Sequence, residues 1–189
     1  MERQLGRRIT EIAKDHCNRY FFAKDLLHGR VLDAACGCGY GSFILNEKCV
    51  VTGVDISEKT IRHAEEFFPG PEYVLGNLAE TPWRGRFSGI VSFETLEHLP
   101  EPKSVLEAFR RCLSGYFVAS VPNENLYPFN PEVFKEDEYP HIRHYKPEEF
   151  DALFKDSGFE VVSRWCQESK QHPEIKAGTD GRFLIYVGC

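Results

Sequence analysis

A glycine-rich stretch directly after an apolar run carries the most specific chemical signal in this chain. Val31-Leu-Asp-Ala-Ala-Cys-Gly-Cys-Gly-Tyr-Gly41 predicts a strand ending in an acid, Asp33, and a loop with three glycines. Gly37, Gly39 and Gly41 let the backbone of such a loop approach a ligand closely. A carboxylate at this place repels a phosphate chain and attracts an ammonium or sulfonium ion. We therefore expect a nucleoside with a cationic tail, for which S-adenosylmethionine is the candidate.

Polar residues at the ends of the next predicted strands extend this site. The strand over residues 50–55 also ends in an acid, Asp55, which can accept hydrogen bonds from both hydroxyls of a ribose. Asn77 and Leu78 follow a third strand and suit the amine and the ring of an adenine. Two acids at consecutive strand ends around a glycine loop favour this interpretation over one in which Asp33 and Asp55 only cap turns.

A second chemical cluster follows the fourth predicted strand. Glu94, Glu97 and His98 have the spacing i, i+3, i+4, so on one helical turn they would share a face. Two carboxylates and an imidazole can hold Mg²⁺ or Mn²⁺, and such an ion can lower the pKa of an attacking hydroxyl. Without a metal, His98 or His141 is the candidate general base, since imidazole titrates near neutral pH.

The elements that must position these residues alternate along the chain. Hydrophobic periodicity and turn residues predict an amphipathic helix through Leu5–Cys17, a helical stretch over 20–27, and a helix capped by Ser57. Further helices are expected over 42–47, from Pro102 to Gly115 and from Pro147 to about Gly158. The predicted strands cover residues 30–35, 50–55, 73–75, 89–93, 116–121, 159–165 and 182–187. This order predicts a doubly wound α/β sheet, whose ligand lies beyond the carboxyl ends of the strands.

We expect residues 1–189 to form a single domain, because this length suits one hydrophobic core and the sequence shows no linker or repeat. Residues 1–29 form a helical segment expected to cover the site. Residues 122–146 are expected to be an insert on the acceptor side, where five aromatic residues could form a wall. They are Tyr127, Phe129, Phe134, Tyr139 and Tyr145. Acids in the same insert disfavour a phosphate-rich acceptor.

The composition excludes several classes of protein. A net charge of −6 argues against a general nucleic-acid binder. The seven cysteines form no CxxC pair, which favours reduced structural thiols over zinc ligands. No apolar run approaches the ~20 residues of a membrane span. The first residues lack the apolar core of a signal peptide, so a cytoplasmic location is expected.

Taken in order, these motifs resemble the class I S-adenosylmethionine-dependent methyltransferases over about residues 28–187. Residues 31–39 are similar to the first motif of that family, 53–57 to its ribose-binding acid and 93–99 to the loop after its fourth strand. Residues 121–123 and 141–162 are similar to its C-terminal third. The resemblance implies a Rossmann-like sheet of seven strands in the order 3-2-1-4-5-7-6, with strand 7 antiparallel and helices on both faces. Asn77 and Ser88 depart from the pattern, since the family usually has Asp at both places.

The Glu-x-x-Glu-His element resembles two groups within this class. They are the ubiquinone-biosynthesis O-methyltransferases and the small-RNA terminal 2′-O-methyltransferases. The RNA enzymes have a later histidine that corresponds to His141. The resemblance therefore implies a metal set of Glu94, Glu97, His98 and His141.

These observations together predict transfer of a methyl group from S-adenosylmethionine to a small molecule, on oxygen, with Mg²⁺ or Mn²⁺ assisting. Two alternatives remain open, a metal-dependent RNA 2′-O-methyltransferase and a non-catalytic scaffold. Full burial of Asp33 behind a filled glycine loop would favour the scaffold. A nicotinamide dehydrogenase is excluded, because Ser42 stands where its GxGxxG fingerprint needs glycine.

The expected site residues fall into groups. Glu94, His98 and His141 are the expected catalytic residues. His144 is expected to be exposed, and His16, His28, His63 and His172 are expected at the surface. The residues expected to bind the cofactor are Asp33, Ala35, Gly37, Gly39, Asp55, Ile56, Asn77, Leu78 and Glu94.

Overall fold

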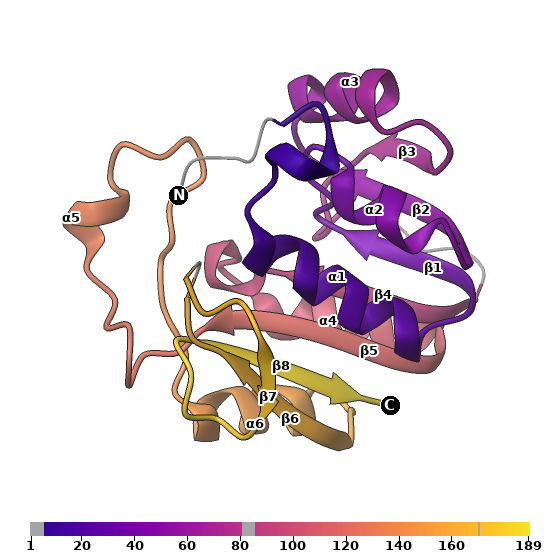
Figure 1. Cartoon of the computed structure of the whole chain (residues 1–189). Helices are drawn as coiled ribbons and strands as arrows, with labels where there is room; N and C mark the ends of the chain where they lie inside the picture. Colours follow the sequence, from indigo (N-terminus) through magenta and orange to yellow (C-terminus); the bar gives the residue numbers. More distant parts are fainter. Residues whose placement is uncertain (1–5, 81–85, 170) are drawn as a thin grey trace.

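The computed structural model describes residues 6–80, 86–169 and 171–189 and shows an α/β fold around one mixed sheet (Figure 1). The sheet has eight strands in the order β3-β2-β1-β4-β5-β8-β6-β7. Neighbours from β3 to β5 are parallel, whereas β8 is antiparallel to both β5 and β6. The strands are β1 (Gly29–Ala34), β2 (Cys49–Asp55), β3 (Glu72–Leu75), β4 (Phe87–Phe93), β5 (Leu113–Pro122), β6 (Val161–Gln167), β7 (Ile175–Ala177) and β8 (Phe183–Gly188).

The predicted order of seven strands is confirmed, but the count is one too low. The additional strand, β7, pairs antiparallel with β6 at the edge of the sheet, with Trp165 opposite Ala177. It has only three residues, and Lys176 is its middle one. So short a strand shows no alternating hydrophobic pattern, which is why the sequence did not predict it.

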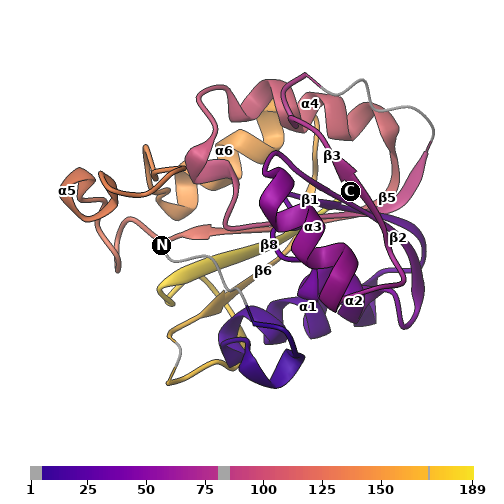
Figure 2. The same cartoon turned by 90° about the horizontal axis from the view of Figure 1, so that it is seen from above.

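Helices cover both faces of the sheet (Figures 1 and 2). On one face α1 and α2 pack over Val31, Val91 and Val118; on the other, α4 and α6 pack over residues that include Leu32 and Ile90. Alternate residues of a strand point to opposite faces, so each central strand contributes to both cores. The helices are α1 (Lys14–Leu26), α2 (Tyr40–Leu45), α3 (Glu58–Phe67), α4 (Pro102–Cys112), α5 (Pro131–Phe134) and α6 (Pro147–Asp156), with 3₁₀ turns η1 (Ile9–Glu11) and η2 (Leu96–His98).

Two predicted helix boundaries are wrong for identifiable reasons. The helix expected over Leu5–Cys17 is a 3₁₀ turn followed by α1, because Ile12 has an extended backbone and buries its side chain; Leu5 lies outside the described residues. Gly115 does not end α4 but lies within β5. A Cβ atom at Gly115 would collide with the carbonyl oxygen of Ser88 on β4, so its glycine permits close approach of two strands.

The order in which successive strands are added to the sheet reverses between β1 and β4. From β1 the chain continues outward to β2 and β3, and from β4 it continues to β5 on the other side. Two residues directly after these strands, Ala35 and Glu94, have positive φ angles of 65° and 49°. No other non-glycine residue among those described has a positive φ. Such strain gathers at functional sites, and the reversal is where ligands bind in open α/β sheets.

Among the described residues, no helix combines the length and the apolar character needed to cross a membrane.

Candidate functional site

A cavity of about 690 Å³ opens at the carboxyl ends of the parallel strands. This volume lies within the range of sites that bind small molecules. Four of the predicted site residues, Asp33, Gly39, Glu97 and His141, do not line the cavity. Those that do line it are Ala35, Gly37, Asp55, Ile56, Asn77, Leu78, Glu94 and His98.

Asp55 braces the glycine loop against the end of β2. Its Oδ2 accepts a hydrogen bond from the amide of Gly37 at 2.9 Å. Its Oδ1 accepts from the amide of Ser57 at 2.9 Å and from the hydroxyl of Thr60 at 3.1 Å. Ser57 lies at the N-cap of α3 as predicted, but its side chain makes no capping hydrogen bond. Through these bonds Asp55 connects the cavity wall to the first turn of α3.

The three glycines of the loop have different surroundings. No heavy atom of the described residues lies within 4 Å of a Cβ built at Gly37, whose φ is +54°. A Cβ at Gly39 would collide with that of Ala64, and one at Gly41 with the ring of Tyr20. Only Gly37 therefore presents backbone to the cavity, and the other two permit close packing.

This difference predicts opposite results for two alanine substitutions. Gly41→Ala should lower the free energy of unfolding by about 1–3 kcal/mol, because the Tyr20 ring must move. Gly37→Ala should cost only about 1 kcal/mol, the strain of a left-handed conformation. It should nevertheless weaken ligand binding at least tenfold, since its methyl group would enter the cavity. Denaturation and calorimetry measure the two effects; equal loss of affinity in both variants would contradict this assignment.

Asp33 lies beneath the loop, where its side chain has no exposed surface. Its Oδ1 accepts a hydrogen bond from the hydroxyl of Tyr20 at 3.1 Å, and its Oδ2 accepts from Ser42 at 2.6 Å. Burial raises the pKa of Asp33 to about 7, although these two hydrogen bonds oppose the shift. One criterion for a scaffold, full burial of Asp33, is met. The second criterion, a filled glycine loop, is not met, because Gly37 lines an open cavity.

Helix α1 contributes three cavity residues that the sequence did not reveal: His16, Arg19 and Tyr20. His16, expected at the surface, lies 3.2 Å from the hydroxyl of Tyr40 through its Nδ1. The spacing i, i+3, i+4 does place these three residues on one face of a helix, which was the one sequence signal for them. The sequence does not show that this face turns toward the strand ends.

Arg19 is the cationic centre of the cavity wall and is only 1% exposed. Its Nη1 lies 2.9 Å from Glu94 Oε1, and its Nη2 lies 3.7 Å from Asp15 Oδ2. No hydrogen-bond partner of Nη2 is found among the described residues. Two buried carboxylates, those of Asp15 and Glu94, therefore flank this buried guanidinium.

Glu94 belongs to this arginine network and not to the predicted metal set. Ser120 donates a hydrogen bond to Glu94 Oε1 at 2.8 Å, in addition to the contact with Arg19. The expected helical turn shared with Glu97 and His98 is wrong, because η2 begins only at Leu96. The positive φ of Glu94 directs its side chain away from that turn. Burial raises the pKa of Glu94, while Arg19 opposes the shift.

Glu97, His98 and His141 do come together, with one ligand atom of each within 4.8 Å of the others. His141 Nε2 lies 3.9 Å from Glu97 Oε1, and His98 Nδ1 lies 3.1 Å from the carbonyl oxygen of Pro140. Burial, and then the nearby Glu94, raise the pKa of Glu97 well above its usual value. Burial lowers the pKa of His98 and brings that of His141 to about 3. This cluster lies at one side of the cavity, which only His98 reaches.

His144 is buried, contrary to the expectation, and its Nε2 lies 2.9 Å from His141 Nδ1. The predicted aromatic wall is largely absent from the cavity: only Tyr139 lines it. Phe134 stacks instead on His141, with ring centroids 4.1 Å apart. Three consecutive acids, Glu136–Glu138, lie beside Tyr139 in the cavity lining.

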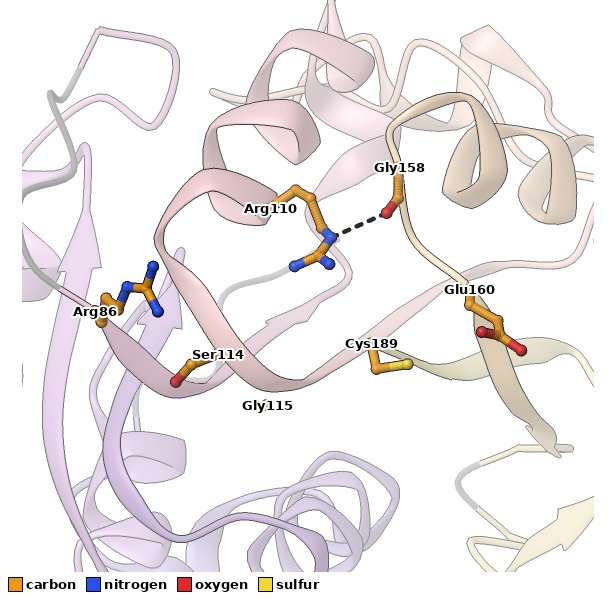
Figure 3. Close-up of a pocket in the computed structure, with 7 residues that line it drawn as sticks. All are labelled: Arg86, Arg110, Ser114, Gly115, Gly158, Glu160 and Cys189. Carbon is orange, nitrogen blue, oxygen red and sulfur yellow. Dashed lines mark hydrogen bonds between the residues drawn. The ribbon is translucent and has the colours of Figure 1, made fainter.

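A second hollow, of about 540 Å³, lies at the opposite end of the sheet (Figure 3). Figure 3 shows the side chain of Arg110 reaching from α4 to the carbonyl oxygen of Gly158, to which its Nε donates at 3.0 Å. Arg86, Glu160 and Cys189 also line the hollow. None of the predicted site residues lies there.

Comparison with known proteins gives a consistent picture. A family model described as "Methyltransferase domain" matches residues 2–164. A protein of Mycobacterium tuberculosis named "Probable S-adenosylmethionine-dependent methyltransferase" is 31% identical over 137 residues, 70% of this chain and 49% of the relative. The ubiquinone biosynthesis O-methyltransferase of Paracidovorax citrulli is 33% identical over 112 residues, 53% of this chain and 46% of the relative. The chain thus spans about half the length of the curated relatives it matches.

Solved structures show the same fold at lower identity. The CcbJ methyltransferase from Streptomyces caelestis superposes with a TM-score of 0.75 at 20% identity, covering 94% of this chain and 95% of its own. The magnesium protoporphyrin IX methyltransferase from Synechocystis, solved with bound S-adenosylmethionine, superposes with a TM-score of 0.63 at 19% identity. It covers 93% of this chain and 76% of its own.

Proposed function

The chain belongs to the S-adenosylmethionine-dependent methyltransferases, and we propose that it transfers a methyl group to an oxygen atom of a small molecule. The observation that carries the proposal is the cavity at the β1–β4 reversal, with its open Gly37 and the carboxylate of Asp55. The ubiquinone O-methyltransferases among the relatives support oxygen as the methylated atom.

The walls of the cavity suit the parts of S-adenosylmethionine. We assign the ribose hydroxyls to Asp55 and the adenine to the wall formed by Ile56, Asn77 and Leu78. We assign the carboxylate of the methionine to the side of the cavity that Arg19 lines, because a guanidinium pairs well with a carboxylate. Asp33 does not line the cavity itself. It accepts a hydrogen bond from Tyr20, which does line the cavity, and so supports the wall from beneath.

When bound, S-adenosylmethionine supplies a methyl group that its sulfonium has already activated, so the protein must position the acceptor and exclude water. Where no cation is bound to its ring, His98 is the candidate to accept the proton of the acceptor hydroxyl. The carbonyl oxygen of Pro140 can only accept a hydrogen bond, so Nδ1 of His98 carries the proton. Its Nε2 then has a lone pair available, and the lowered pKa keeps the ring neutral.

A divalent cation fits the cluster of Glu97, His98 and His141. Both carboxylate oxygens of Glu97, and Nε2 of His141, are buried without a hydrogen-bond partner within the part of the chain that the structure describes. Unsatisfied acceptors are costly unless a cation or donor reaches them. We propose that these three residues hold the ion, and two imidazoles favour Mn²⁺ over Mg²⁺. Such an ion would lower the pKa of an acceptor hydroxyl beside it.

The acidic side of the cavity favours a small neutral or cationic acceptor over RNA. Glu136, Asp137 and Glu138 line it together, whereas Arg19 is the one cationic residue among its described lining. A cleft with this balance repels phosphate groups. Phosphate contacts dominate the affinity of proteins for nucleic acids, so an RNA acceptor is disfavoured.

Calorimetry with S-adenosylmethionine and S-adenosylhomocysteine tests the donor site directly. We expect micromolar binding of both, and Asp55→Ala should weaken it by about 1–3 kcal/mol, or 10–100-fold. The exposed Asp25 provides the matched control, as Asp25→Ala should leave binding unchanged. Failure of the unmodified protein to bind either compound would overturn the proposal.

The acceptor requires a second experiment. Release of S-adenosylhomocysteine should be measured with candidate small hydroxylated acceptors and with short RNAs, each with Mn²⁺ or with a chelator. We expect release with a small acceptor only. Turnover of RNA that requires Mn²⁺ would instead support the 2′-O-methyltransferase alternative. Full turnover in chelator would contradict the metal assignment alone.

A further inference from the structure

We propose that His144 is a positioning residue that holds His141 in one tautomer, with the Nε2 lone pair of His141 directed at Glu97 and His98. The inference extends the cation site of the proposed function, on which its catalytic consequence rests. The arrangement of the two rings itself follows from hydrogen bonds that involve neither the methyl donor nor a metal ion.

A series of hydrogen bonds that begins at a backbone carbonyl fixes first the tautomer of His144 and then that of His141. Nδ1 of His144 lies 2.6 Å from the carbonyl oxygen of Tyr127, which can only accept, so Nδ1 of His144 must carry a proton. At a pH above about 6.5 an imidazole carries one proton only, so Nε2 of His144 is an acceptor. Nδ1 of His141 lies 2.9 Å from that Nε2 and must therefore donate. A neutral His141 then has no proton on Nε2.

Packing holds both rings in this relation. Phe134, the one buried residue of α5, lies parallel to His141 with an interplanar angle of 5°. The same phenylalanine meets the edge of His144 at a centroid distance of 5.6 Å, and Tyr127 lies 4.8 Å from His144 on centroids. Rotation of either imidazole would disturb these contacts. The segment around α5 therefore fixes ring orientation as well as proton position.

Without His144, the hydrogen bond that keeps the proton of His141 on Nδ1 is lost, and the tautomer with the proton on Nε2 becomes accessible. Glu97 Oε1 lies 3.9 Å from Nε2 of His141, and a carboxyl oxygen attracts an N–H. A proton on Nε2 would then remove the lone pair that a cation needs. With His144 present, neither His141 nor His98 places an N–H between its lone pair and the oxygens of Glu97. Residues that orient a metal-binding histidine in this way commonly change metal affinity 10–100-fold.

Two substitutions of His144 separate proton positioning from packing. In His144→Gln, the side-chain oxygen lies near the place of Nε2 and can still accept from His141, while the amide can donate to the Tyr127 carbonyl. In His144→Phe, the ring volume remains but the acceptor is lost. Long-range ¹H–¹⁵N spectra of histidine-labelled protein without metal report which nitrogen of His141 carries the proton. Titration with Mn²⁺ reports the cation affinity.

We expect His141 to be protonated on Nδ1 in the unmodified protein and in His144→Gln, with Mn²⁺ affinities within about threefold of each other. His144→Phe should move the proton to Nε2 in a large fraction of molecules and weaken Mn²⁺ binding about 10–100-fold. A proton on Nε2 in the unmodified protein, or an unchanged tautomer in His144→Phe, would overturn the inference. Absence of Mn²⁺ binding with the expected tautomers would overturn only the cation site of the proposed function.

Discussion

Replacing Arg19 by methionine is expected to lower the free energy of unfolding by about 3–5 kcal/mol, the cost of leaving buried charges without their partner. Arg19 is 1% exposed and lies between two acids, Asp15 and Glu94, whose side chains are also buried. Methionine preserves most of the volume and removes only the charge and its hydrogen bonds. Urea denaturation at pH 7, followed by circular dichroism, measures the loss.

A second substitution identifies the cause of this loss. In Arg19→Met with Glu94→Gln, one of the two unpaired carboxylates becomes neutral, so part of the lost stability should return. Arg62→Met is the surface control, since the Arg62–Glu58 pair is 73% and 63% exposed and should contribute little. A loss in Arg19→Met no larger than in Arg62→Met would show that the Arg19 network does not stabilise the fold.

Asp33→Asn is expected to change the pH dependence of stability by about 3 kcal/mol between pH 5 and 8. The pKa of Asp33 is about 7 in the fold, raised from 3.8 by burial. Between these two values the folded state binds a proton that the unfolded state has released. The contribution of the protonated group is complete below pH 4 and is lost as pH rises through 7. The unmodified protein should therefore lose stability over this range, and the asparagine variant should lose less.

The comparison requires denaturation of both proteins at pH 5 and pH 8. Asparagine retains an oxygen for one of the donors, Tyr20 or Ser42, so the two proteins should have similar stability at pH 5. At pH 8 the variant should be the more stable. Asp25→Asn, at an exposed site, serves as the control for removal of an acid elsewhere. Parallel profiles for Asp33→Asn and the unmodified protein would show that Asp33 is ionised throughout.

The fold was largely predictable because its signals are local. Alternating apolar runs, glycines and prolines mark strand and helix ends within a few residues, and consecutive α/β units follow a fixed handedness. These signals predicted the doubly wound sheet, and the family resemblance supplied its strand order, which is correct apart from the three-residue β7. The N-terminal helix was misplaced because the periodicity of Leu5–Cys17 does not show that Ile12 is extended to reach the core.

The site was predictable only where a residue's role depends on its place at a strand end. Asp55, Gly37, Leu78 and His98 all lie at the cavity for that reason. The position of a metal ligand was harder to predict. Glu94 has the spacing for a shared helical turn with Glu97, but Arg19 from a distant helix and a positive φ direct it elsewhere.

From the sequence we could read the alternation of strands and helices, the glycine loop and the acids that flank it, because each depends on neighbours along the chain; the spatial order of the strands came from the family resemblance. Three contacts became visible only in the fold: Tyr20 covers Asp33, Arg19 lies beside Glu94, and His144 is hydrogen-bonded to His141. The partners and the burial of a polar side chain depend on which distant segments pack against it. Those two properties determine its protonation and its free hydrogen-bonding positions, and so which residues of a motif can act in the chemistry.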